Sequence, residues 1–157
     1  MGFYQEKYSQ HFNSSIDELW DFISNPNNLK LITPDYMGFD IVSKDLPNKI
    51  YEGMIISYKV SPLLGIKTTW VTEITHISDK NYFVDEQRVG PYEIWHHQHF
   101  LESTSKGTLM KDIVSYKPPF GILGKIANQV IIKKKLDEIF SFRAKVLKEL
   151  FEEDAKN

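Results

Sequence analysis

One uninterrupted stretch near the C-terminus, IKKKLDEIFSFRAKVLKELFEE at residues 132–153, predicts how the whole chain is arranged. At about 3.6 residues per turn, its large apolar side chains gather on one side of a helix and most charged ones on the other. The apolar stripe consists of Ile132, Leu136, Ile139, Phe140, Val146, Leu147 and Leu150. The outer side is too charged for a membrane span. A helix of this length needs a partner surface of matching length, and only the segments before it can supply one.

Those preceding segments alternate between apolar and polar residues, which is typical of strands. We expect strands at residues 3–12, 39–44, 54–61, 67–77, 82–89, 92–102 and 108–117. Short connections with turn residues, such as Gly90-Pro91 and Ser105-Lys106-Gly107, join several of them as hairpins, so the sheet is antiparallel. The predicted fold is therefore α+β and of the helix-grip type. A curved antiparallel sheet of about seven strands, in the order β-α-α-β6-α, wraps around the long C-terminal helix.

Two shorter helical segments are expected near the N-terminus. Ser15 and Glu18 fit a capping box that starts the first, and Pro26 ends it. A second short helical turn is predicted at residues 27–33. Near the other end of the chain, the apolar stripe of residues 122–131 is about half a turn out of phase with the stripe after it. We therefore predict a bend or break around residues 131–135, with a short covering helix before it.

Length, composition and charge exclude several classes of protein. A chain of 157 residues is expected to form one domain, residues 1–157. It contains no cysteine, which excludes disulfides and thiolate chemistry. Its net charge of -2 lacks the basic surplus of a nucleic-acid-binding domain, so no nucleic-acid partner is predicted. No strand leads through a glycine-rich turn into a helix, which excludes dinucleotide-binding and phosphate-loop motifs. No secretory signal opens the sequence, and a cytoplasmic location is expected.

Several motifs in the second half of the chain are similar to those of one protein superfamily. They are Phe83-Val84-Asp85-Glu86-Gln87, Gly90-Pro91-Tyr92, Trp95-x-His97-x-His99, Gly107-Thr108, Asp112-x-Val114-x-Tyr116, Pro119-Phe120-Gly121 and Ile139-Phe140-x-Phe142-Arg143. Together with the element order, they resemble the START-like, or SRPBCC, helix-grip superfamily, which includes the Bet v 1-like proteins. Within it, they resemble the bacterial ligand-binding SRPBCC domain proteins of the polyketide cyclase and "cell division inhibitor"-like group. The resemblance implies an internal cavity between sheet and helix, but no single activity, because the superfamily holds lipid and hormone binders as well as polyketide cyclases.

Trp95, His97 and His99 share one face of their strand, because side chains alternate. Composition does not choose between the two faces, and the resemblance places this one toward the cavity. A tight turn between the last two strands would set His99 beside Asp112 and Trp95 beside Tyr116. A carboxylate beside an imidazole raises the proton affinity of the ring and fixes its tautomer. Such a pair would orient a ligand's hydroxyl or carbonyl group, transfer protons, or form a buried polar network that satisfies only itself.

Five further residues are candidates for the cavity wall: Tyr58, Trp70, Asp85, Gln87 and Arg143. The resemblance places Tyr58 and Trp70 inside, where rings of this size serve more often as core than as ligand contacts. Asp85 and Gln87 share one face of their strand, so both would enter the cavity if that face looks inward. Arg143 falls within the apolar stripe of the C-terminal helix, where a guanidinium must reach water or a carboxylate. A structural ion pair between Asp85 and Arg143 is the simpler expectation.

The histidines also invite a metal interpretation. His97, His99 and Asp112 would offer two nitrogens and a carboxylate, the ligand set of some iron and zinc sites. Two histidines two residues apart on a strand are an unspecific signal, and no second motif supports them. No metal and no other cofactor are therefore predicted.

These features favour the binding of a small, largely apolar molecule, such as a lipid, an isoprenoid or a polyketide-like compound. The alternative is a cyclase or dehydratase whose His–Asp pair moves protons on a bound carbonyl compound. A further alternative is a module that regulates a partner protein or forms a homodimer. It would use the apolar loops at residues 61–66 and 118–124, which otherwise would gate the cavity. No stable membrane insertion is expected.

Overall fold

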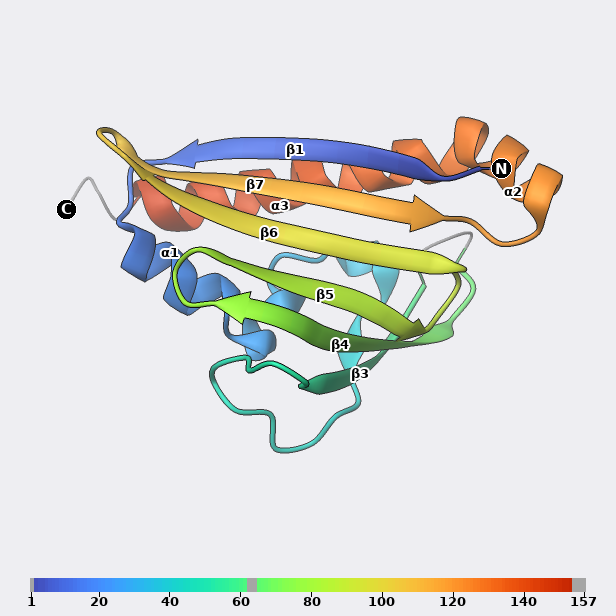
Figure 1. Ribbon diagram of the computed structural model, residues 1–157, viewed down its shortest axis with the longest axis horizontal. Helices are drawn as coiled ribbons and strands as arrows, with labels where there is room; N and C mark the ends of the chain where they lie inside the picture. The colour runs from blue at the N-terminus through green and yellow to red at the C-terminus, as the bar shows by residue number, and fades with distance from the viewer. Residues whose placement is uncertain (1, 62–64, 154–157) are drawn as a thin grey trace.

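The computed structural model describes residues 2–61 and 65–153, and the strands described there form one sheet (Figure 1). They are β1 (Tyr4–Phe12), β2 (Asp40–Ile41), β3 (Ile55–Val60), β4 (Thr68–Ser78), β5 (Tyr82–Val89), β6 (Ile94–Thr104) and β7 (Gly107–Lys117). Their order across the sheet is β1-β7-β6-β5-β4-β3-β2, and each neighbouring pair is antiparallel. The helices are α1 (Ile16–Ile23), α2 (Gly121–Ala127) and α3 (Lys133–Glu153), with 3-10 turns at Pro26–Lys30 and Asp35–Met37.

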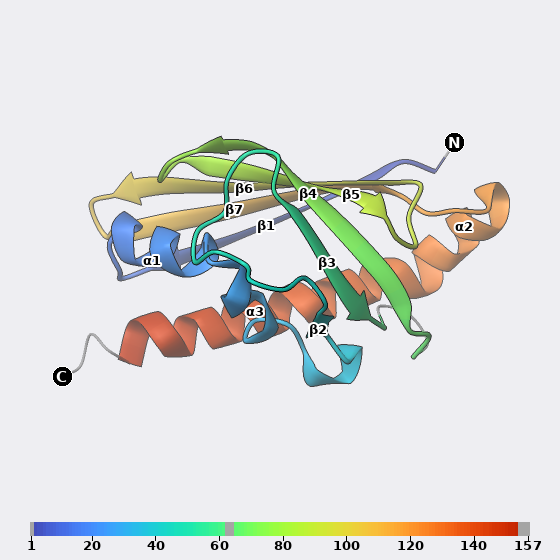
Figure 2. The same ribbon diagram turned by 90° about the horizontal axis from the view of Figure 1, so that it is seen from below.

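Helix α3 runs along one side of the curved sheet. Figure 2 shows it below the sheet, with β3 and β4 bending down toward it. Leu136, Phe140 and Leu147 of α3 are buried, and the ring of Phe140 stacks on Tyr8 of β1 with ring centroids 4.0 Å apart. The predicted helix-grip arrangement is therefore confirmed. Among the described residues, no helix has the length and apolar character that crossing a membrane requires.

The N-terminal helix begins as the sequence predicts. Ser15 Oγ accepts a hydrogen bond from the backbone N–H of Glu18, and the Glu18 carboxylate accepts one from the backbone N–H of Ser15. This reciprocal capping satisfies donors that the first turn leaves free. The second predicted helix, at residues 27–33, is instead the 3-10 turn Pro26–Lys30.

The strand boundaries match the predicted ones to within two residues, except in β2. The sequence predicts a strand at residues 39–44, but β2 spans only Asp40–Ile41. The backbone N–H groups of Val42 and Ser43 both donate to the carbonyl oxygen of Ser57, at 2.8 and 3.1 Å. Two donors on one acceptor interrupt the regular ladder, and the strand ends there.

The predicted bend lies between α2 and α3. A π-helical turn spans Asn128–Ile132, so it overlaps the predicted position and starts three residues earlier. A π turn holds more residues than an α turn, which rotates the apolar stripe that follows. The prediction that the short helix before the bend covers the rest of the fold is wrong for α2, because its Ile122 and Leu123 are 79% and 71% exposed. Figure 1 shows the reason: α2 projects past the end of β7.

The turn between β6 and β7 depends on Gly107. Its φ is +109°, and a Cβ atom there would lie 2.1 Å from the carbonyl oxygen of Phe12. We expect Gly107→Ala to lower the free energy of unfolding by about 2 kcal/mol or more, measured by urea denaturation. Gly53→Ala is the matched control, because Gly53 has a φ of +85° but no atom within 4 Å of its Cβ position. Equal losses in the two variants would contradict the clash with Phe12.

Candidate functional site

Three neighbouring strands bring two histidines and two aspartates into one buried cluster, called here the His–Asp cluster. His97 and His99 come from β6, with Asp85 on β5 to one side and Asp112 on β7 to the other. His97 lies opposite Asp85, and His99 lies opposite Asp112. Both histidines are buried, at 4% and 7% exposure. The predicted pairing of His99 with Asp112 across the two strands is confirmed, as is that of Trp95 with Tyr116.

Each imidazole of the His–Asp cluster contacts both carboxylates. His97 Nε2 hydrogen-bonds to Asp112 Oδ1 at 2.8 Å, and His99 Nε2 hydrogen-bonds to Asp85 Oδ2 at 2.7 Å. The Nδ1 atoms approach the other partners: His97 Nδ1 lies 3.3 Å from Asp85 Oδ2, and His99 Nδ1 lies 3.0 Å from Asp112 Oδ1. All four ring nitrogens therefore face a carboxylate oxygen.

These contacts favour a protonated His97. An ionised carboxylate only accepts hydrogen bonds, so a ring nitrogen without a proton would face a negative oxygen. With both rings protonated, the cluster carries two positive and two negative charges and is neutral overall. Burial alone would lower the pKa of His97, but the charge of Asp85 and the hydrogen bond to Asp112 raise it. Burial alone would raise the pKa of each aspartate, but the two histidines hold both pKa values well below the usual range.

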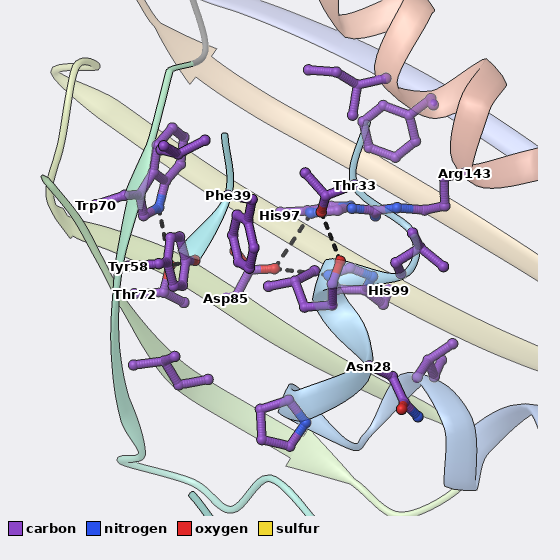
Figure 3. Close-up of a pocket in the computed structure, with 18 of the residues that line it drawn as sticks. Asn28, Thr33, Phe39, Tyr58, Trp70, Thr72, Asp85, His97, His99 and Arg143 are labelled. Atoms are coloured by element: carbon purple, nitrogen blue, oxygen red, sulfur yellow. Dashed lines mark hydrogen bonds and ion pairs between the residues drawn. The ribbon is translucent and has the colours of Figure 1, made fainter. Parts of the chain in front are cut away.

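A cavity of about 170 Å³ lies beside the His–Asp cluster. The sheet, residues 22–33 and α3 form its wall, and most of that wall is apolar. The apolar side chains include Ile32, Phe39, Ile56, Val60, Ile74 and Phe140. Figure 3 shows Asp85 reaching His97 and His99 at this wall. Few polar groups join it, and they include Asn28 and Thr33.

Two aromatic side chains and a threonine form another part of the wall. Tyr58 and Trp70 lie opposite each other on β3 and β4. Thr72 Oγ1 accepts a hydrogen bond from Trp70 Nε1 at 3.0 Å and also bonds to the hydroxyl of Tyr58. Burial and the nearby charge of Asp85 raise the pKa of Tyr58, so its hydroxyl keeps its proton. The predicted inward direction of Tyr58 and Trp70 is confirmed.

Arg143 extends from α3 into the same cavity (Figure 3). Its guanidinium lies over the ring of Phe140, 5.0 Å from the ring centre. Its Nε atom is buried and has no hydrogen-bond partner. The expected ion pair with Asp85 is wrong, because the carboxylate of Asp85 contacts His97 and His99 instead.

Three predicted site residues do not line this cavity: Gln87, Asp112 and Tyr116. Asp112 reaches the site only through the histidines, and Tyr116 is fully buried among aromatic rings. Gln87 serves the turn between β5 and β6, since its side-chain amide donates to the carbonyl of Tyr92 at 2.7 Å. Its Oε1 accepts from the N–H of Tyr92, which explains why β6 begins only at Ile94.

The cavity wall also holds polar residues that the sequence analysis did not propose. Thr72 shares a strand face with Trp70, so alternation along β4 was a usable signal. Asn28 and Thr33 come from an irregular segment that has no periodicity, and nothing in the sequence places them here.

The cluster brings together side chains that could act as metal ligands, and they include Asp85 in addition to the set considered from the sequence. One ligand atom from each of Asp85, His97 and His99 lies within 4.8 Å of the others. Each histidine would have to release a proton and give up a carboxylate contact to bind a metal. The Asp112 carboxylate suggested by the sequence also lies within 3.0 Å of both histidines.

The described residues of the two apolar loops are not part of the cavity wall. Residues 62–64 of the loop at 61–66 lie outside the described residues, and Ile66 beside them is 67% exposed. In the loop at 118–124, Phe120 is 80% exposed, and none of these residues forms part of the cavity wall.

Comparisons with known proteins identify the fold and no more. No protein-family model matches the chain, and no curated protein matches it by sequence. Solved structures do match along nearly the whole chain. Protein CV1439 from Chromobacterium violaceum has a TM-score of 0.70 at 12% identity, over 94% of this chain and 97% of that one. TTHA0849 from Thermus thermophilus has a TM-score of 0.69 at 15% identity, over 98% and 99%.

A plant protein shares the same architecture. The major latex-like protein 151 from Panax ginseng has a TM-score of 0.68 at 12% identity, over 95% of this chain and 97% of that one. Likenesses at such low identity establish a common fold, and they confirm the START-like helix-grip fold that the sequence resembles. The narrower resemblance to one bacterial group stays a prediction.

Proposed function

We propose that this protein binds a compact, largely apolar small molecule in the cavity between sheet and α3. The observation that carries the proposal is the composition of the wall. Apolar and aromatic side chains surround most of the space, and a few polar groups, among them Asp85 and Arg143, join the wall. Small-molecule sites combine apolar surface for affinity with a few polar groups for orientation.

The cavity size limits the ligand. Its volume of about 170 Å³ is below the roughly 300–1,000 Å³ typical of drug-sized ligands. It is close to the roughly 150 Å³ of an apolar cavity that takes up benzene. A single ring compound or a short isoprenoid or polyketide-like molecule therefore suits it, whereas a long lipid chain would have to extend outside.

The His–Asp cluster limits the role of the histidines. All four ring nitrogens already face carboxylate oxygens, so a ligand hydroxyl would meet Asp85, Tyr58 or Arg143 before a free imidazole nitrogen. In this proposal the histidines hold Asp85 in place and balance its charge. The same engagement weakens the cyclase or dehydratase alternative, because a general base needs a nitrogen free to take a proton.

Filling the cavity tests the proposal. Ile56 is 4% exposed and lines the cavity, so Ile56→Phe should occupy ligand space and weaken binding of 3-phenylpropanol at least about tenfold. Isothermal titration calorimetry measures the dissociation constant. Ile55→Phe is the matched control, because Ile55 precedes it on β3 and is 51% exposed on the other face. Equal affinity in both variants would overturn the proposal. It would also be overturned if the unaltered protein bound neither 3-phenylpropanol nor any compound that co-purifies with it from its host.

A second candidate function rests on exposed apolar residues in the first turn of α2 and directly before it. Phe120, Ile122 and Leu123 are 71–80% exposed, which suits a regulatory contact with a partner or a second copy. Sedimentation analysis of the protein and of Leu123→Ser tests the second-copy form. A monomer in both would count against it, whereas a dimer lost in Leu123→Ser would support it.

A further inference from the structure

We propose that the ligand carries a carboxylate or similar anionic group, and that Arg143 binds this group. The inference rests on the proposed function and names the chemical class of its ligand: a compact apolar acid. Arg143 would pair with the acid, while the apolar wall encloses the rest of the molecule.

The first step is the charge at the cavity wall. Asp85 is compensated by His97 and His99, and the His–Asp cluster as a whole is neutral when both rings are protonated. Lys135, the other cation of the wall, pairs with Glu138 at 2.6 Å. Among the described residues, no ion pair joins a carboxylate to the Arg143 guanidinium. Arg143 is therefore the cation of the described cavity wall whose charge has no anionic partner.

The second step is the position of Arg143. An arginine that only reached for water would keep its nitrogen atoms hydrated. Here Nε is buried without a hydrogen-bond partner, and the guanidinium packs over Phe140. A buried donor left unsatisfied is destabilising, and more so when the group is charged. A ligand acceptor at this place would remove that destabilisation.

The third step is the chemistry of the group. A guanidinium is planar and presents its N–H donors as a fork that matches the two oxygens of a carboxylate. It bears a permanent charge, so the preference for an anion holds across the pH range of binding experiments. A neutral hydroxyl would fill only one donor and leave the charge unpaired.

The experiment compares compounds that share a skeleton. Titration calorimetry measures 3-phenylpropanoate, 3-phenylpropanol and methyl 3-phenylpropanoate against the unaltered protein, Arg143→Gln and Arg143→Lys. We expect the unaltered protein to bind the carboxylate at least about tenfold more tightly than the alcohol or the ester. Arg143→Gln should lose this preference, and Arg143→Lys should keep part of it. Lys145 is an exposed cation of α3, so the control variant Lys145→Gln should leave the affinities for all three compounds unchanged.

The outcomes separate the two proposals. Binding of the alcohol without a preference for the carboxylate would overturn the role of Arg143 and leave the proposed function intact. Absence of binding by all three compounds, together with the absence of any compound co-purifying from the host, would overturn both. A preference that persists in Arg143→Gln would also overturn the role of Arg143. If Arg143→Gln does not fold, the ester comparison on the unaltered protein still tests the preference for an anion, and a reduced preference in Arg143→Lys still tests the role of Arg143.

Discussion

Replacing Asp112 by Asn is expected to lower the free energy of unfolding by about 3–5 kcal/mol at neutral pH, measured by urea denaturation. Asp112 is 6% exposed and contacts both His97 and His99, at 2.8 and 3.0 Å. The amide keeps the shape of the side chain but removes its negative charge. The two imidazoles would then share one carboxylate, so the cluster must bury an uncompensated positive charge or release a proton.

Two comparisons show whether the loss comes from this cluster. Asp40→Asn removes a carboxylate whose side chain is 69% exposed and paired with Lys30, and it should have no measurable effect. A double-mutant cycle of Asp112→Asn with His97→Gln should be strongly non-additive, because the two side chains share a hydrogen bond. Additive losses, or a small loss in Asp112→Asn, would show that the cluster does not act as one unit.

The sequence predicted the His99–Asp112 pair because a short hairpin fixes register. Side chains alternate along a strand, so a tight turn after Thr104 leaves few ways to align β6 with β7. Gly107 supplies the backbone conformation that this turn requires. Local turn chemistry and alternation were sufficient to predict this contact.

The second carboxylate of the cluster could not be assigned in the same way. An ion pair of Asp85 with Arg143 is the prediction from the sequence, because each needs a partner of opposite charge inside an apolar surface. Which cation Asp85 meets depends on where α3 lies over the sheet, which no local pattern records. In the structure β6 is the immediate neighbour of β5, and the histidines of β6 contact Asp85 in place of Arg143.

Local sequence patterns did not predict which residues of the irregular segments line the cavity. Asn28 lies in the 3-10 turn Pro26–Lys30 and Thr33 follows that turn, and both line the cavity. The helix α2 carries an apolar stripe, which normally indicates a buried face, but it projects past β7 and stays exposed. An apolar stripe on a helix predicts that this face packs against another surface, but it does not indicate whether that surface belongs to the same chain.

The stability of the protein should be greatest between about pH 4 and about pH 6.5 and fall on both sides. The histidines lower the pKa values of Asp85 and Asp112 in the folded protein, so their contribution is present above the unfolded value near pH 4 and is lost on acidification. The pKa of His97 is raised, mainly by Asp85 acting against burial, so its contribution is complete below about pH 6.5 and is lost as pH rises through the folded value.

Urea denaturation at intervals from pH 3 to pH 9 measures this profile. His97→Gln should flatten the alkaline side, because it removes the group whose proton is lost there. His96→Gln is the matched control, since His96 is the neighbouring histidine on β6 and pairs with Glu86 on the opposite face of the sheet. A constant free energy of unfolding from pH 5 to pH 9 would mean that His97 carries the same protons in both states. The neutral cluster of two imidazolium ions and two carboxylates would then be wrong, and with it the charge balance that leaves Arg143 as the unpaired cation of the described wall.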